Sequence, residues 1–153
     1  MKNFVVLVAE DDDGDYFILE RAFKKAQFTH PVFRATDGQS AVDYLAGGNP
    51  YSDRQAYPFP SLLLLDLKMP LKHGFDVLRW IRTEAPATVR LLPTILFSSS
   101  SRPEDVERGY QLGANGFLTK ATTVEAMVET IRAIESFWIN QNCFSDRRSE
   151  VPR

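Results

Sequence analysis

Short apolar runs alternate along this chain with longer segments in which apolar residues recur at helical spacing. The short runs are typical of buried parallel strands, and the longer segments are typical of amphipathic helices. The predicted strands occupy about residues 4–9, 32–35, 62–65, 94–97 and 116–119. The predicted helices occupy about residues 14–27, 37–45, 74–83, 101–112 and 122–140.

This strict alternation of five strands and five helices predicts a parallel sheet with helices on both faces. The expected fold class is α/β, a flavodoxin-like (βα)5 doubly wound parallel sheet with strand order 2-1-3-4-5. Gly47 is placed to end the second helix, and residues 49–60 hold three prolines and no periodicity, which predicts a loop. Ser101 with Glu104 predicts a capping box for the fourth helix, and Gly113 is placed to end it.

The composition narrows the class of protein without identifying a function. The 153 residues suffice for one domain with its own core. A net charge of −2 offers no basic surplus for nucleic acid, and the single cysteine, Cys143, excludes a disulfide framework. The N-terminal apolar run is too short for a signal peptide, and no run approaches a membrane span. We therefore expect a protein of a reducing, bacterial cytoplasm that binds neither nucleic acid nor membrane.

Four of the predicted strands run directly into polar residues that could act together. Glu10 and Asp11 follow the first strand, Asp66 the third, Ser98 the fourth and Lys120 the fifth. Because the carboxyl ends of parallel strands lie along one edge, where ligands bind in open α/β folds, these side chains should converge. Each residue alone is more often an ordinary solvated loop residue, so the prediction depends on their joint occurrence.

This set of side chains suits magnesium-dependent phosphoryl chemistry. Phosphoryl transfer spreads negative charge over three oxygens, which Mg²⁺ held by carboxylates can neutralise. Three neighbouring carboxylates would also repel one another, and a divalent cation removes that repulsion. Asp66 follows a wholly apolar strand and is the expected nucleophile. Lys120 is expected to pair with carboxylate or phosphoryl oxygens, and Ser98 to donate a hydrogen bond to the phosphoryl group.

The motifs around these residues resemble the receiver domains of two-component response regulators. The matching segments, which together cover most of residues 1–141, are Leu7-Val8-Ala9-Glu10-Asp11, Leu65-Asp66-Leu67-Lys68-Met69-Pro70 with Gly74, Pro93 through Ser98-Ser99, and Gly113 through Lys120. The resemblance implies that Asp66 is the phosphoacceptor. It also implies a Mg²⁺ site made by Asp11, Asp66, the backbone carbonyl of Lys68 and, through water, Glu10. The implied phosphoryl-binding and switch residues are Ser98, Lys120 and Phe117.

Two positions depart from the common receiver pattern. Ala121 stands where a proline usually follows the lysine, and Phe117 stands where tyrosine is common. These departures, the loop at 49–60 and the pair Phe137-Trp138 resemble the single-domain receivers associated with phytochrome-type histidine kinases. The resemblance implies a histidine kinase of that type as the partner.

Some apolar residues fall outside the predicted buried stripes and are candidates for partner surfaces. Tyr16 and Phe17 on the first helix are expected to contact the kinase, although one exposed aromatic residue is common in any protein. A second set suits either a homodimer, through the face made by 101–112, 116–119 and 122–140, or packing of the C-terminal extension over the domain. Its members are Ala126, Ala133 and Phe137, which fall outside the stripe of the last helix, together with Phe144 and with Trp138, which the spacing places in that buried stripe.

The expected function is therefore a single-domain response regulator that signals by phosphorylation-dependent protein interaction and is not an enzyme. The receiver is expected over residues 1–141, with an extension over 142–153 and no output domain. Two alternatives stay open, a phosphate-independent scaffold of receiver fold and a Mg²⁺-dependent phosphohydrolase that attacks through Asp66. Such hydrolases usually carry an aspartate two residues after the nucleophile, where this chain has Lys68. No glycine-rich phosphate loop is present, which disfavours nucleotide binding.

Overall fold

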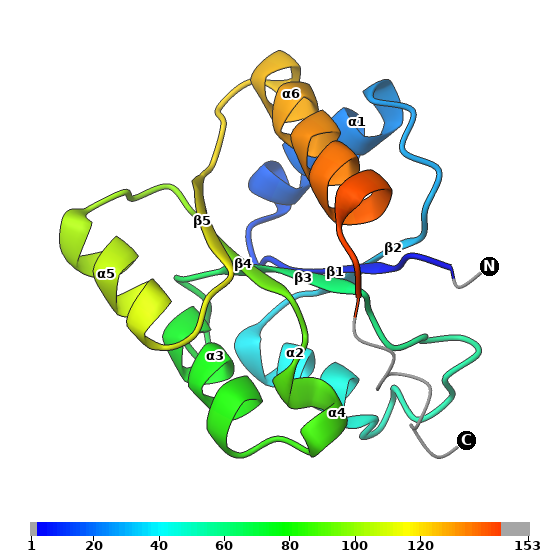
Figure 1. Cartoon of the computed structure of the whole chain (residues 1–153), viewed down its shortest axis with the longest axis vertical. Helices are drawn as coiled ribbons and strands as arrows, with labels where there is room; N and C mark the ends of the chain where they lie inside the picture. Colours follow the sequence, from blue (N-terminus) through cyan, green and yellow to red (C-terminus); the bar gives the residue numbers. More distant parts are fainter. Residues whose placement is uncertain (1–2, 145–153) are drawn as a thin grey trace. The chain divides into compact units, whose positions relative to one another are not determined.

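The computed structural model describes residues 3–144 of the chain (Figure 1). Within these residues the contacts define two compact units. The first unit contains residues 3–12 and 30–120, and the second contains residues 13–29 and 121–144. The predicted extension from residue 145 onward lies outside the described residues.

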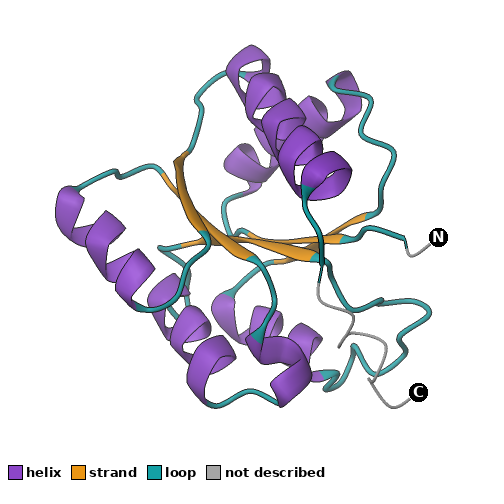
Figure 2. Cartoon of the chain, in the orientation of Figure 1, coloured by secondary structure: helices purple, strands orange, loops and turns teal. Residues whose placement is uncertain are grey.

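The first unit is built on a parallel five-stranded sheet, drawn in orange in Figure 2. Its order is β2-β1-β3-β4-β5, which confirms the predicted flavodoxin-like topology. The strands are β1 Val6–Ala9, β2 Val32–Ala35, β3 Leu62–Asp66, β4 Thr94–Ser98 and β5 Gly116–Thr119. The four leucines of β3 are each at most 1% exposed, as expected of a central strand that is buried on both faces.

The register of the strands aligns their carboxyl ends. Near that edge the sheet pairs Ala9 with Leu65, Asp66 with Phe97 and Ser98 with Thr119. Glu10 therefore leaves β1 beside the end of β3, and Lys120 leaves β5 beside the end of β4. The residues that follow the strands are brought to one edge, as the sequence pattern requires.

Four helices of the first unit lie on the same side of its sheet, in the lower part of Figure 1. They are α2 Gly38–Ala46, α3 Gly74–Thr83, α4 Ala87–Arg90 and α5 Pro103–Gln111. Their apolar faces and the alternating sheet residues form one core, whose members include Leu7, Tyr44, Leu45, Leu63, Leu65, Leu78, Ile81 and Leu96. The short helix α4 was not predicted, because a single helical turn carries no periodic signal.

The ends of two helices can be compared with the predicted start and stop residues. Asp37 caps α2 by accepting a hydrogen bond from the Ser40 backbone N at 2.6 Å, and Gly47 ends it with a left-handed φ of 73°. The predicted capping box at Ser101 is wrong, because α5 begins at Pro103 and has no side-chain cap. A residue that precedes proline is held in an extended conformation, as Arg102 is here, so the helix cannot start earlier.

The predicted loop at 49–60 contains neither helix nor strand but is firmly anchored. The Arg54 guanidinium donates hydrogen bonds to the carbonyls of Tyr44 at 2.8 Å, Leu45 at 3.1 Å and Tyr57 at 3.2 Å. The bonds to Tyr44 and Leu45 supply donors at the end of α2, where the last carbonyls lack helical partners; the Tyr44 carbonyl also accepts from the Gly47 backbone N at 3.2 Å. The rings of Tyr44, Tyr51 and Tyr57 pack together with centroids 5.0 to 6.0 Å apart.

The second unit contains α1 Asp13–Lys25 and α6 Val124–Ile134, which continues into the π-helix η1 Glu135–Gln141. Lys25 of α1 and Glu125 of α6 are 3.2 Å apart. The predicted single helix over 122–140 thus changes from an α-helix to a π-helix at residue 135. Trp138 was expected in the buried stripe of that helix but is half-buried, since the wider π-helical turn shifts which residues share a face. None of the helices described is both long and apolar enough to pass through a membrane.

Candidate metal centre

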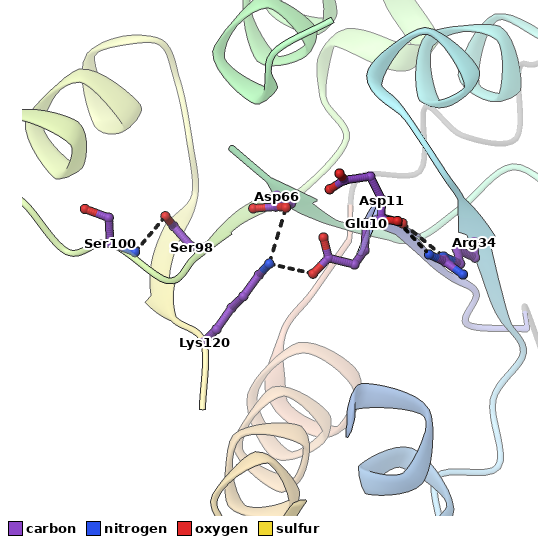
Figure 3. A network of polar contacts seen from close by, with 7 residues as sticks. All are labelled: Glu10, Asp11, Arg34, Asp66, Ser98, Ser100 and Lys120. Carbon is purple, nitrogen blue, oxygen red and sulfur yellow. Dashed lines mark hydrogen bonds and ion pairs between the residues drawn. The ribbon is translucent and has the colours of Figure 1, made fainter. Parts of the chain in front are cut away.

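Three carboxylates from two strands meet at the carboxyl edge of the sheet (Figure 3). Glu10 and Asp11 follow β1 directly, and Asp66 is the last residue of β3. One carboxylate oxygen from each lies within 4.8 Å of the others. Glu10 and Asp66 are 4% and 7% exposed, so these two carboxylates are largely removed from water. The structure thus brings together acidic residues that are more than fifty positions apart in the sequence.

Lys120 joins this group from the end of β5. Its Nζ lies 2.5 Å from Glu10 Oε1 and 3.3 Å from Asp66 Oδ2. The Lys120 backbone N donates to the Ser98 carbonyl at 2.8 Å, which holds the residue at the edge of the sheet. Lys120 therefore bridges the two buried carboxylates as a compact cation.

One ammonium does not balance three carboxylates. Glu10 Oε2 is buried and has no hydrogen-bond partner within residues 3–144. Burial and the neighbouring Asp66 raise the pKa of Glu10 to about 8, although Lys120 opposes the shift. An unsatisfied buried oxygen beside two further carboxylates is the donor set that Mg²⁺ binds, since this ion prefers a few carboxylates together with water and phosphate oxygens. The residues present therefore fit the cation that the sequence predicts.

The loop that carries Lys68 is shaped by two glycines. A Cβ on Gly74 would lie 2.3 Å from the Asp66 carbonyl, so only glycine allows α3 to start this close to β3. A Cβ on Gly38 would lie 1.9 Å from the Lys72 carbonyl, a close approach that the sequence analysis did not identify. Lys68 itself is exposed and follows Asp66 by two positions.

The two predicted switch residues occupy β4 and β5. Ser98 is buried at the end of β4, and its Oγ accepts a hydrogen bond from the Ser100 backbone N at 3.1 Å. Phe117 is half-buried on β5 and packs against the core. A Cβ on Gly109 of α5 would lie 2.6 Å from Leu96 and 3.3 Å from the Phe117 ring, so this glycine makes room for the Leu96 side chain and lets the ring lie close. Sequence reasoning missed Gly109, since a glycine inside a helix is uninformative without its neighbours.

The sequence analysis also did not identify Arg34, which contacts the backbone of two of the acidic residues. Its Nε donates to the Glu10 carbonyl at 2.9 Å and its Nη2 to the Asp11 carbonyl at 3.3 Å. The available signal was a charged residue inside the apolar run 32–35.

The predicted kinase-contact residues belong to the second unit and lie on α1. Phe17 is 56% exposed, and the guanidinium carbon of Arg21 lies 5.5 Å from the centre of its ring. Tyr16 is half-buried. Their role stays a prediction.

Comparison with known proteins identifies the class. Residues 6–132 match the response regulator receiver domain, so the chain belongs to this family. The match spans both units and contains every candidate site residue named above.

The relatives include response regulators of light-sensing systems. The chain is 30% identical to response regulator Rcp1 of Synechocystis sp. over 135 residues, which are 88% of each protein. It is 36% identical to response regulator RPA3017 in red light signalling of R. palustris, with a TM-score of 0.87 over 93% of this chain and 98% of that one. It is 27% identical to the phosphorylated cyanobacterial phytochrome response regulator RcpA, with a TM-score of 0.82 and the same coverage. The predicted resemblance to phytochrome-associated receivers is confirmed.

Proposed function

We propose that this chain accepts a phosphoryl group from a histidine kinase onto Asp66, in a Mg²⁺-dependent reaction, and passes the signal on through phosphorylation-dependent protein contacts. The observation that carries the proposal is the cluster of Glu10, Asp11 and Asp66 bridged by Lys120. The receiver is proposed over residues 1–141, with 142–153 as an extension. The proposed location is the cytoplasm.

Each side chain has a role that follows from its position. Asp11, Asp66, the Lys68 carbonyl and, through water, Glu10 would hold Mg²⁺. The ion would supply positive charge beside the transferred group. An oxygen of Asp66 forms a bond to phosphorus while the bond from phosphorus to the kinase imidazole nitrogen breaks, and the electron pair of that bond stays on the nitrogen. Lys120 Nζ, 3.3 Å from Asp66, is placed to bind a phosphoryl oxygen.

A phytochrome-type kinase is the proposed donor. RcpA is a phytochrome response regulator and RPA3017 acts in red light signalling, and the chain spans nearly the whole length of both. The solved structure of Rcp1 with bound Mn²⁺ supports a divalent cation in this acidic pocket.

Phosphorylation of the purified protein tests the proposal. Incubation with acetyl phosphate and Mg²⁺ should add the mass of one phosphoryl group, and peptide mapping should locate it on Asp66. Asp66→Asn should gain no mass, whereas Asp76→Asn, which changes an exposed carboxylate on α3, should behave as wild type. Modification of Asp66→Asn at the wild-type rate would contradict the proposal. Uptake that stops at one group per chain separates a receiver from a phosphohydrolase, and no uptake would indicate a phosphate-independent scaffold.

Switching is proposed to run through Ser98 and Phe117. The Ser98 hydroxyl would turn to donate to the phosphoryl group, and the Phe117 ring would move into the space that it leaves. Phosphorylation of wild type should then change amide exchange in residues 103–111, which contact the ring through Gly109. Phe117→Ala should take up phosphate normally and lose that change. An unaltered exchange response in Phe117→Ala would exclude this role.

Two proposals concern partners. Tyr16 and Phe17 are proposed to contact the kinase, and Phe17→Asp should slow transfer from a purified kinase without slowing uptake from acetyl phosphate.

Self-association remains a prediction, which sedimentation of the phosphorylated and unphosphorylated protein would decide.

A further inference from the structure

We propose that Arg34 is a positioning residue for the metal centre, because its guanidinium fixes the backbone that presents the Glu10 and Asp11 carboxylates. This inference rests on the proposed function, since it concerns the same metal centre. Arg34 lies on β2, and its side chain reaches the segment beyond the end of β1. Figure 3 shows it on the opposite side of that segment from Asp66 and Lys120.

The segment that Arg34 binds is where the sheet stops holding the chain. The Glu10 backbone N still donates to the Ala35 carbonyl at 3.0 Å, which continues the pairing of β1 with β2. The next two carbonyls, of Glu10 and Asp11, accept from the Arg34 side chain at 2.9 Å and 3.3 Å. These two bonds fix the orientation of two successive peptide groups. The carboxylates carried by the same two residues are then held toward Asp66.

Arginine is suited to this task because its donors are arranged as a rigid fork. Nε and Nη2 point in fixed relative directions and reach both carbonyls at once. Bonds from a charged donor are also stronger than those between neutral groups. A lysine at this position would keep the charge but could not hold two peptide groups in a defined relation.

Positioning matters here because Mg²⁺ tolerates little distortion of its octahedral ligand shell. Outer partners that orient metal ligands typically change metal affinity by about 10- to 100-fold when they are removed. Arg34 contacts the backbone of the ligand residues and not the ion, so it belongs to this class of outer partner.

A role for the charge of Arg34 alone predicts the opposite result. A guanidinium near the site repels a bound cation, so removal of the charge should tighten Mg²⁺ binding. Removal of the fork should weaken it. The sign of the change in affinity therefore separates positioning from simple electrostatics.

The test compares Arg34→Gln, which loses the charge and the fork, with Arg34→Lys, which loses only the fork. Arg79→Gln is the matched control, since it removes an exposed arginine on α3. Binding is measured by titration with Mn²⁺, followed through the spin-resonance signal of the free ion, and by competition with Mg²⁺. We expect both Arg34 variants to bind about 10- to 100-fold more weakly and the control to bind as wild type. At saturating Mg²⁺, their rates of phosphorylation by acetyl phosphate should return close to the wild-type rate.

Equal or tighter Mg²⁺ binding by Arg34→Gln would overturn the positioning role, and so would a rate that stays low at saturating Mg²⁺. If Arg34→Gln does not fold, Arg34→Lys decides, because it keeps the charge and most of the aliphatic stem. Thermal unfolding without metal checks that both variants are folded. Failure of the wild type to bind Mn²⁺ or to be modified on Asp66 would instead refute the proposed function. The two failures are thus distinguishable.

Discussion

The acidic pocket holds two buried carboxylates and the loop at 49–60 holds a half-buried arginine, Arg54, but the two regions of the first unit pair these charges differently. In the loop, the Arg54 guanidinium has three carbonyl acceptors, two of which, Tyr44 and Leu45, lie at the end of α2. In the pocket, the Lys120 ammonium pairs with the Glu10 and Asp66 carboxylates beside Asp11, and Glu10 Oε2 has no hydrogen-bond partner among the described residues. In the loop the charged group is paired with acceptors. In the pocket the carboxylates outnumber the ammonium group that pairs with them.

This difference separates groups that stabilise the fold from groups that serve a function. A buried polar group that is fully hydrogen-bonded contributes to stability, and one that is not costs free energy. The protein keeps such a cost at the carboxyl edge of its sheet, where a bound divalent cation would offset it. Substitutions in the two regions should therefore change stability in opposite directions.

The largest effect is expected from Arg54→Ala. The substitution removes three hydrogen bonds from a charged donor and leaves the Tyr44 carbonyl with only the Gly47 backbone N at 3.2 Å, while the Leu45 carbonyl loses the bond from Arg54. The free energy of unfolding should fall by about 3 kcal/mol, measured by urea denaturation, while phosphate uptake by Asp66 is retained. As a control, Arg79→Ala removes an exposed arginine that forms an ion pair with Asp76. This substitution should change the free energy of unfolding by less than about 0.5 kcal/mol. A loss of phosphate uptake in folded Arg54→Ala would show that the two regions are not independent.

A somewhat smaller effect is expected from pH in metal-free protein. The pKa of Glu10 is raised from its ordinary 4.5 to about 8, so the folded state holds a proton that the unfolded state releases. That contribution to stability is complete below about 4.5 and is lost as the pH rises through about 8. Between about pH 6.5 and pH 9 the free energy of unfolding should fall by about 2 kcal/mol through this group.

Glu10→Gln is the control for the pH effect, because its side chain does not titrate. It should flatten the profile and be more stable than wild type at about pH 9. Mg²⁺ should reverse the wild-type trend, since the ion binds the ionised carboxylate and stabilises the folded state most at high pH. A wild-type profile parallel to that of Glu10→Gln would mean that the carboxylate is not perturbed in the folded protein.

The smallest effect is expected from Tyr44→Phe. The Tyr44 hydroxyl donates to the Pro58 carbonyl at 3.0 Å, and the ring is 1% exposed. Loss of this single bond should lower the free energy of unfolding by about 1 kcal/mol, measured by thermal or urea unfolding. Tyr110→Phe changes a ring that is 52% exposed and should have no measurable effect. Equal losses of unfolding free energy in Tyr44→Phe and Tyr110→Phe would mean that the Tyr44 hydroxyl bond does not stabilise the loop.

Much of the fold and of the candidate site was predictable because the signals are local. The apolar run 62–65 followed by Asp66 predicts both a buried strand and the edge at which its carboxylate emerges. The start of α5 was mispredicted because a capping-box pattern at Ser101 competes with the extended conformation that Pro103 imposes on Arg102. The change to a π-helix at residue 135 has no comparable local signal in this sequence.

The sequence by itself determined the order of strands and helices, the family resemblance and the acidic residues at the strand ends, because periodicity and strand ends are written in neighbouring residues. Only the tertiary structure decided that Arg34 binds the carbonyls of Glu10 and Asp11 and that Arg54 donates to the Leu45 carbonyl at the end of α2. It also decided that Gly109 makes room for Leu96 beside Phe117. These contacts join residues that are 8 to 24 positions apart. Their partners depend on how the elements pack, and packing is a property of the whole fold that no local pattern encodes.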